Sequence, residues 1–250
     1  MAWPRSTSNK PEKVNGQWLD SARRYADLTT DLSRDSEYLR REGLVPTMIS
    51  LIGPTTDKIV LDAGCGTGWL FDTIDAAEAW ECDLQVPSTR PAHVTSSRED
   101  VTDLRYPDNY FDVVVSSLVL MWVSDFSAAL TEAFRVTRPG GRLVVSLVHP
   151  YFNHAGQVCG NGFLIDRDLS VEAEWDDYYI SGVVGPLTYY YRLPEQYYNA
   201  AVKAGWRLVN FRDWFVDIAH YRREAAGRKA HILRTGMVPT FTFFVAEKAT

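Results

Sequence analysis

The first regular pattern along the chain is helical. From Trp18 to Ile52, apolar and aromatic side chains recur three or four residues apart, and a Gly53-Pro54 pair then interrupts them. This spacing places the apolar side chains on one face of a helix, and a glycine followed by a proline is typical of a helix end. The pattern predicts two or three helices in this region.

The period then changes to that of buried strands. The run Lys58–Asp62 is short, apolar and rich in branched side chains, and it leads directly into a glycine-rich turn. Similar runs follow at Ala79–Cys82, Phe111–Ser116 and Arg142–Leu147, with a helical stretch at Ser127–Val136. Strands that alternate with helices predict a parallel sheet built from right-handed crossovers.

Regularity is lost after His149-Pro150 and returns near the C-terminal end. A helix is expected at Pro194–Ala204, followed by two strands at Arg207–Phe215 and Thr240–Ala246 that should pair antiparallel. The predicted fold class is α/β: a doubly wound, mostly parallel, seven-stranded Rossmann-like sheet with an N-terminal helical lid and an insertion after strand five.

A chain of 250 residues is long enough for one sizeable α/β domain with room for an insertion. Residues 1–16 mix Pro, Ser, Asn, Lys and Gly without periodicity and are expected to form a mobile tail. We assign residues 17–250 to a single domain. Its expected parts are the helical lid at 17–53, a core at 57–150, an insertion at 151–193, and a C-terminal helix with antiparallel strands at 194–250.

Composition narrows the choice of partners. With 26 basic and 32 acidic residues, the formal net charge is -6, which repels nucleic acid unless the basic residues cluster. The cysteines are odd in number and lack C-x-x-C spacing, so neither a disulfide framework nor a metal site is expected. No run approaches the roughly 20 apolar residues that span a bilayer, and no signal peptide is evident. We therefore expect a cytoplasmic protein without membrane partners, either a monomer or a homodimer.

Three glycines, Gly64, Gly66 and Gly68, stand at alternate positions just after the first predicted strand. Glycine lets the backbone turn tightly and approach a ligand, and a helix starting there would offer free N–H groups to a carboxylate or phosphate. The G-x-G-x-G spacing differs from the G-x-G-x-x-G of dinucleotide-binding proteins. The alternative interpretation is that these glycines only form a turn.

Further segments along the chain match, in the same order, the motifs of one known family. With the glycine loop they resemble the class I S-adenosylmethionine-dependent methyltransferases, in particular small-molecule enzymes with the pattern D-x-G-x-G-x-G, over about four-fifths of the chain. The matching segments are Val60–Gly68, Trp80–Leu84, Glu99–Leu104, Tyr110–Leu118 and Glu132–Arg142.

The resemblance implies S-adenosyl-L-methionine as cofactor and assigns residues to its parts. The implied cofactor-binding residues are Asp62, Gly64, Cys65, Gly66 and Gly68 at the methionine part, Asp83 and Leu84 at the ribose, Asp100 and Val101 at the adenine, and Ser117 and Leu118 beside the methionyl group. The segment between Asp83 and Asp100 departs from the family because it is short and contains Pro87 and Pro91, which disfavour a helix. We expect the adenine side to be built differently. Both acids could also be ordinary surface charge.

His149 is the candidate catalytic residue. It follows strand five directly, at the sheet edge where α/β proteins bind ligands, and an imidazole accepts a proton near neutral pH. A histidine at a strand end could instead serve only to bond the backbone.

Aromatic residues are concentrated on both sides of the predicted site. The candidate substrate-binding residues are Tyr25, Tyr151, Trp175, Tyr178 and Tyr191. Aromatic rings form flat apolar walls and bind cations, so an aromatic or amine-bearing substrate is expected. They could equally pack the insertion. The resemblance thus implies methyl transfer to an O, N or C atom of a small molecule. An NAD(P)-dependent oxidoreductase and a non-catalytic S-adenosylmethionine-binding module are the alternatives.

Overall fold

The computed structural model describes residues 34–151, 158–159, 162–163, 173–178, 187–224 and 238–250. The N-terminal segment and parts of the insertion lie outside these ranges. Tyr25 is among the residues that are not described, and the side chains of Trp175 and Tyr178 are likewise outside the description.

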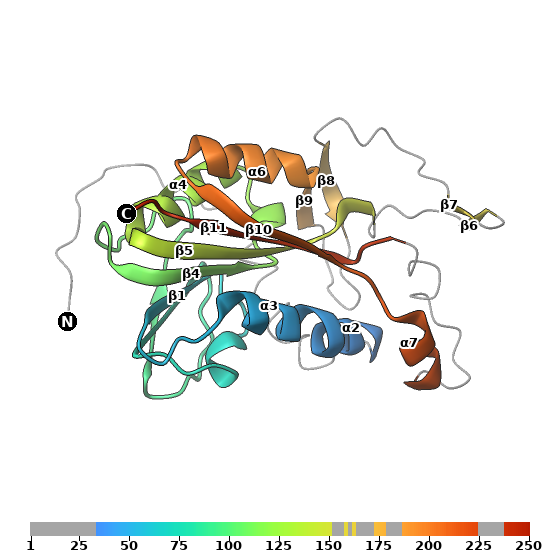
Figure 1. Cartoon of the computed structure of the whole chain (residues 1–250), viewed down its shortest axis with the longest axis horizontal. Helices are drawn as coiled ribbons and strands as arrows, with labels where there is room; N and C mark the ends of the chain where they lie inside the picture. The colour runs from blue at the N-terminus through green and yellow to red at the C-terminus, as the bar shows by residue number, and fades with distance from the viewer. Residues whose placement is uncertain (1–33, 152–157, 160–161, 164–172, 179–186, 225–237) are drawn as a thin grey trace.

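A seven-stranded sheet forms the centre of the molecule (Figure 1). Its strands, in spatial order, are β10 (Arg207–Trp214), β11 (Phe241–Glu247), β5 (Thr137–Val148), β4 (Phe111–Ser117), β1 (Ile59–Ala63), β2 (Glu78–Asp83) and β3 (Val94–Arg98). Strand β11 runs antiparallel to both neighbours, and the other pairs are parallel. The predicted α/β fold with a mostly parallel seven-stranded sheet is confirmed.

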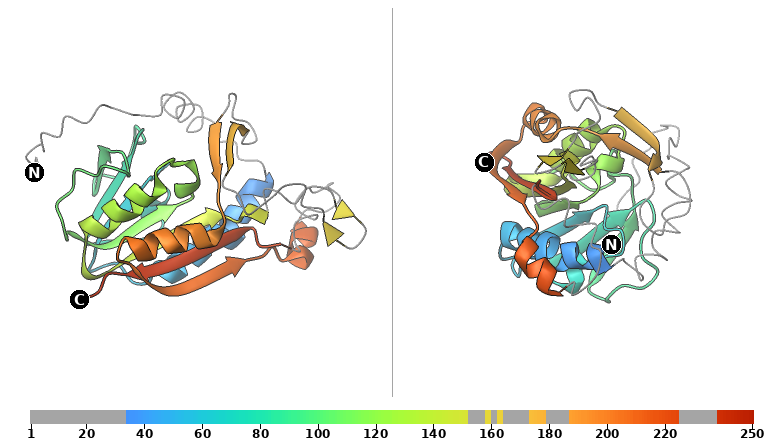
Figure 2. Two further views of the ribbon diagram at one scale, coloured as in Figure 1. Left: turned by 90° about the horizontal axis from the view of Figure 1, so that it is seen from above. Right: turned by 90° about the vertical axis from the view of Figure 1, so that its right-hand side faces the viewer.

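Helices cover both faces of the sheet, as Figures 1 and 2 show. On one face lie α2 (Arg34–Leu39), the π-helical turn η2 (Arg40–Leu44) and α3 (Val45–Ile52); on the other lie α4 (Phe126–Val136) and α6 (Pro194–Lys203). Met48 and Ile52 of α3 are buried in one apolar cluster with Val144, whereas Leu130 and Ala201 belong to a second cluster on the opposite face. Burial on both faces explains why the central strands are continuously apolar.

Neither crossover beside β2 forms an α-helix; the prolines indicated this for the β2–β3 crossover, but a helix was expected after the glycine loop. Residues 64–77 contain only the 3-10 turn η3 (Leu70–Asp72), and residues 84–93 contain no helix. The expectation of a helix directly after the glycine loop is therefore wrong. Residues 69–77 must both leave the glycine turn and return to the start of β2, which leaves room for one turn. In the second crossover, Pro87 and Pro91 oppose a helix.

Two small antiparallel pairs lie in the insertion: β6 (Val158–Cys159) with β7 (Gly162–Phe163), and β8 (Ala173–Tyr178) with β9 (Leu187–Tyr191). A further helix, α7 (Ile218–Glu224), packs on α2 through an edge-to-face contact between Tyr221 and Tyr38, with ring centroids 4.8 Å apart. Among the described residues, no helix is long and apolar enough to cross a membrane.

Arg192 ties the end of β9 to the segment that follows β4. Its buried guanidinium donates hydrogen bonds to the carbonyl oxygens of Leu120, Val123 and Ser124 at 3.3, 2.9 and 2.9 Å. The guanidinium carbon also lies 4.4 Å from the centroid of the Phe126 ring. These contacts fix β9 over the carboxyl end of the sheet.

We expect Arg192→Met to lower the free energy of unfolding by about 2–4 kcal/mol, because three carbonyls would lose a charged donor inside the protein. Arg192→Lys should recover less than half of this loss, since an ammonium lacks the planar fork that reaches all three carbonyls. Urea unfolding of both variants measures the effect. A change below about 0.5 kcal/mol in Arg192→Met would contradict the assignment.

Candidate functional site

The site lies at the carboxyl edge of the parallel strands. β1 ends at Ala63, β2 at Asp83, β4 at Ser117 and β5 at Val148, so the segments after these strands meet at one edge of the sheet. In open α/β sheets this edge is where ligands bind. The glycine loop and most of the candidate residues follow these four strand ends.

The three glycines of the loop all have left-handed backbone angles, with φ of 85° at Gly64, 54° at Gly66 and 79° at Gly68. The backbone N–H groups of Gly64 and Cys65 both donate to the carbonyl of Cys82, at 2.8 and 2.9 Å. This pair of bonds turns the chain sharply at the end of β1. Only glycine adopts such angles without strain.

The space around each glycine differs. A Cβ on Gly64 would lie 2.4 Å from a methyl carbon of Val119, and a Cβ on Gly68 would lie 2.5 Å from the guanidinium carbon of Arg90. A Cβ on Gly66 would have no atom within 4 Å. Gly66 therefore faces the open space at the loop, whereas its two neighbours are packed against protein.

Asp83 is joined to the glycine loop. Its carboxylate oxygens accept hydrogen bonds from the N–H of Gly66 at 3.0 Å and from the N–H of Gln85 at 3.1 Å. Burial raises the pKa of this carboxyl, and the backbone donors act in the opposite direction. The structure thus brings two predicted cofactor residues together. Leu84, the next residue, is half-buried in the same turn.

Asp62 lies beneath the loop with only 1% of its surface exposed. Neither of its carboxylate oxygens has a hydrogen-bond partner in the part of the chain that the structure describes. Burial, with a smaller contribution from the nearby carboxylates of Glu81 and Asp83, raises the pKa of Asp62 to about 8. The negative charge of the neighbouring Glu81 and Asp83 carboxylates disfavours a phosphate at this position.

The raised pKa of Asp62 makes a prediction about stability. A carboxyl that binds its proton more tightly when folded stabilises the protein fully below about pH 4, and this contribution is lost as the pH rises to about 8. We expect the wild type to lose stability relative to Asp62→Asn over that range, by on the order of 3–6 kcal/mol. Denaturant unfolding of both proteins across this pH range measures the difference. Parallel curves would contradict it.

The exit of β4 faces the loop. Leu118 has a left-handed backbone, with φ of 58°, and its N–H donates to the carbonyl of Ser146 at 3.0 Å. The Ser117 hydroxyl lies 3.1 Å from that of Ser146. A leucine in this conformation is strained, and such strain is found preferentially at functional sites. The Leu118 turn leads directly to Val119, which packs against Gly64.

Asp100 begins a tight turn just after β3. One of its oxygens accepts from the N–H and from the hydroxyl of Thr102, at 2.9 and 2.8 Å, and Val101 packs against the apolar cluster under α4. The N–H of Glu99 donates to the carbonyl of Asp83 at 3.1 Å, so the two candidate acids lie on neighbouring strand ends. In the glycine loop, the remaining candidate residue besides the three glycines is Cys65. It is a buried free thiol, and burial raises its pKa.

His149 follows β5 and is buried, with 5% of its surface exposed. Its backbone N–H donates to the carbonyl of Thr240 at 2.8 Å, and its Nδ1 accepts from the N–H of Tyr151 at 3.2 Å. In the neutral ring the proton is therefore on Nε2. Burial lowers the pKa of His149, and the carboxylate of Asp213 partly opposes this shift.

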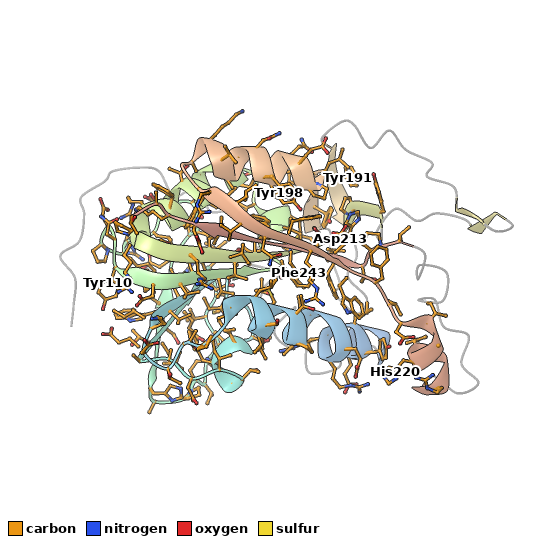
Figure 3. The ribbon with its side chains drawn as sticks, in the orientation of Figure 1. Tyr110, Tyr191, Tyr198, Asp213, His220 and Phe243 are labelled. Atoms are coloured by element: carbon orange, nitrogen blue, oxygen red, sulfur yellow. The ribbon has the colours of Figure 1, made fainter. Side chains whose placement is uncertain are left out.

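The candidate tyrosines have different environments. Tyr191 is buried in the core cluster under α6, and Tyr151 is 36% exposed, with its ring 4.8 Å from that of His149. Figure 3 shows Tyr191, Tyr198 and Asp213 at the same end of the sheet, opposite the end at which Tyr110 lies. Burial raises the pKa of both Tyr191 and Tyr198.

Two residues near the site were missed by the sequence analysis. Asp213 of β10 has a buried carboxylate oxygen with no hydrogen-bond partner in the described structure. Arg90 lies against the glycine loop from the β2–β3 crossover. Neither belongs to a recognisable motif, because one is on an edge strand and the other is in an irregular loop. Within the described ranges, no three His, Cys, Asp or Glu side chains form a group that could hold a metal ion.

Comparisons with known proteins agree with this geometry. A family model described as a methyltransferase domain matches residues 61–145. A demethylmenaquinone methyltransferase from Beutenbergia cavernae is 36% identical over 152 residues, covering 57% of this chain and 61% of that protein. A malonyl-[acyl-carrier protein] O-methyltransferase from Erwinia pyrifoliae is 35% identical over 143 residues, covering 54% and 53%. The chain therefore spans little more than half the length of the curated relatives that it matches.

A solved structure extends the likeness beyond this region. An S-adenosylmethionine-dependent methyltransferase from Mesorhizobium loti is 24% identical, with a TM-score of 0.64 over 81% of this chain and 96% of that one. The fold, the glycine loop and the matched region agree with one another and with the predicted cofactor. Residues 61–145 thus match a methyltransferase domain, and the described chain has the fold of a solved S-adenosylmethionine-dependent methyltransferase, as the motifs predicted.

Proposed function

We propose that the chain transfers the methyl group of S-adenosylmethionine to an O, N or C atom of a small organic molecule. The observation that supports this most is the open space at Gly66, whose N–H donates to the carboxylate of Asp83. S-adenosylmethionine has two cationic groups, an ammonium and a sulfonium, which suit an acidic site. The Asp83 carboxylate accepts from the N–H groups of Gly66 and Gln85, one on each oxygen, and a carboxylate has lone pairs for further hydroxyl donors.

The cofactor, when bound, supplies a methyl group on a sulfonium sulfur. The chain's own task is to hold the acceptor in line and to exclude water, because displacement at such a carbon needs proximity more than acid–base assistance. The glycine loop would hold the methionine part, Asp83 the ribose and Asp100 the adenine amino group. The strained turn at Leu118 would fix the wall beside the reacting end.

A base is required when the acceptor carries a proton, and His149 is our candidate. Nδ1 would receive this proton. It would then no longer accept the hydrogen bond from the N–H of Tyr151, whose nitrogen lies 3.2 Å away. Nε2 would keep its proton, and the Asp213 carboxylate would favour the imidazolium that forms. The lowered pKa of His149 keeps the ring neutral, and so able to accept a proton, at pH 7.

We infer that the acceptor has a flat ring or an amine. Tyr151 is partly exposed beside His149, so an aromatic face borders the proposed reaction centre. The name of one matched relative specifies a quinone, which also has a flat ring, and the other relative acts on a malonyl group held by a carrier protein.

Transfer of labelled methyl from S-adenosylmethionine to a panel of quinols, phenols, amines and carboxylic acids tests the proposal. We expect labelled product from a quinol, a phenol or an amine, and none from a free carboxylic acid. Oxidation of a substrate with NAD(P), without methyl transfer, would favour the oxidoreductase. Cofactor binding without any acceptor in the panel would favour the non-catalytic module.

A further inference from the structure

The β2–β3 crossover, residues 84–93, contains a buried cation. The side chain of Arg90 is 9% exposed, and its Nε lies 2.9 Å from each carboxylate oxygen of Glu81, a fully buried residue of β2. Its Nη1 also donates to Asp72 of η3 at 3.2 Å. A third bond to Glu81 comes from the hydroxyl of Ser96 on β3, at 2.6 Å. One guanidinium therefore joins the segments on both sides of β2.

The same guanidinium lies directly against the glycine loop. A Cβ built on Gly68 would be 2.5 Å from the guanidinium carbon of Arg90 and 2.7 Å from its Nε. Contact this close requires that residue 68 have no side chain. The position of Gly68, and with it the end of the loop, depends on where Glu81 and Asp72 hold the arginine.

The contacts of Arg90 take the place of a helix, which the segments beside the glycine loop do not form. The segment after the loop forms only the short turn η3, and no helix from the β2–β3 crossover covers this part of the sheet. Within the described residues, the loop is held by the end of β2, through Cys82 and Asp83, and by Arg90, with no helix beside it. A buried ion pair contributes little to stability on average. This one holds the guanidinium through Nε and Nη1, while the buried Nη2 has no hydrogen-bond partner in the part of the chain that the structure describes.

We propose that Arg90 is the positioning residue of the cofactor loop: held by Glu81 and Asp72, it fixes Gly68 and keeps the loop in its binding conformation. This inference rests on the proposed function, because it assumes that the loop binds S-adenosylmethionine. Arg90 acts through the loop backbone and needs no contact with the ligand. Its planar group, which binds Glu81 through Nε and Asp72 through Nη1, suits this role, and an ammonium would not reproduce it.

Calorimetric titration with S-adenosylhomocysteine tests the inference on the full chain. We expect Arg90→Lys to raise the Kd about 10-fold, and Arg90→Met about 100-fold, because the loop must then be ordered at the expense of binding energy. Millimolar guanidinium should restore part of the affinity of Arg90→Met, whereas the same concentration of potassium chloride should not. Rescue of this kind separates loop positioning from a general loss of stability.

Arg135→Lys is the matched control. Arg135 also binds carboxylates and carbonyls, namely Glu132, Asp108, Leu104 and Tyr106, but at the amino end of β4, away from the loop. The Arg135→Lys variant should have a lower melting temperature and an unchanged Kd for S-adenosylhomocysteine. If Arg90→Met does not fold, the comparison of Arg90→Lys with Arg135→Lys decides. Wild-type affinity in Arg90→Lys would overturn the inference, whereas absence of binding by the wild type would overturn the proposed function instead.

Discussion

Replacing Gly66 with leucine is expected to abolish cofactor binding while the protein still folds. The backbone at Gly66 has φ of 54°, and the direction of its missing Cβ is open for 4 Å. A leucine side chain would therefore meet no protein atom at its Cβ and would extend into the space proposed for the ligand. The cost to folding is limited to the left-handed backbone, about 1–2 kcal/mol. We expect the Kd for S-adenosylhomocysteine to rise by at least about 100-fold.

Gly53 provides a matched control for this variant. It ends α3 with φ of 72°, and a Cβ there would also have no atom within 4 Å, but it is not in the glycine loop. Gly53→Leu should therefore lose at least as much stability in urea unfolding, because φ of 72° with ψ of -165° is a region that side chains avoid, and should keep wild-type affinity for the cofactor. If both variants bind equally well, the open side of Gly66 is not where the ligand lies.

His149→Ala should lower kcat by roughly 100-fold to 10,000-fold, with little change in cofactor affinity. The imidazole is the candidate proton acceptor, and its removal leaves the glycine loop and Asp83 intact. In the wild type, the rate should stay constant from neutral pH downwards and decline only below about pH 6.5, because burial lowers the pKa of His149. Protonation of the ring then removes the acceptor.

Steady-state kinetics of wild type and His149→Ala from pH 5 to pH 8 measure both effects. Asp217→Asn is a suitable control, because this exposed carboxylate accepts hydrogen bonds from backbone N–H groups at the start of α7 and should leave the profile unchanged. Near-normal turnover and an unaltered pH profile in His149→Ala would mean that His149 is not the base and serves only to bond the backbone of Tyr151.

The central strands and the glycine loop could be predicted because their signals are local. Strands β1, β4 and β5 are apolar on both faces, so they appear as continuous apolar runs in the sequence. The edge strand β3 was not predicted. It contains the polar residues Thr95, Ser96 and Ser97, and its pairing with β2 depends on a backbone register that no side-chain pattern reveals.

The contacts around the site were harder to predict because they join distant segments. The contact between Arg90 and Gly68 depends on a crossover without a helix, and the sequence indicates only that prolines disfavour a helix there. The interaction of Asp213 with His149 depends on the order β10-β11-β5 in the sheet. Tyr191 was predicted at the substrate site, and the structure buries it in the core. This burial depends on the pairing of β9 with β8 and on the contacts of Arg192, which join distant segments.

The central claim is that the glycine loop binds S-adenosylmethionine, and calorimetric titration of the wild-type chain tests it most directly. Separate titrations with S-adenosylmethionine, S-adenosylhomocysteine and NAD(P) under the same conditions give the comparison. We expect saturable binding of both sulfur compounds at one site per chain, and no binding of NAD(P). Binding of NAD(P), or no heat with either sulfur compound, would contradict it.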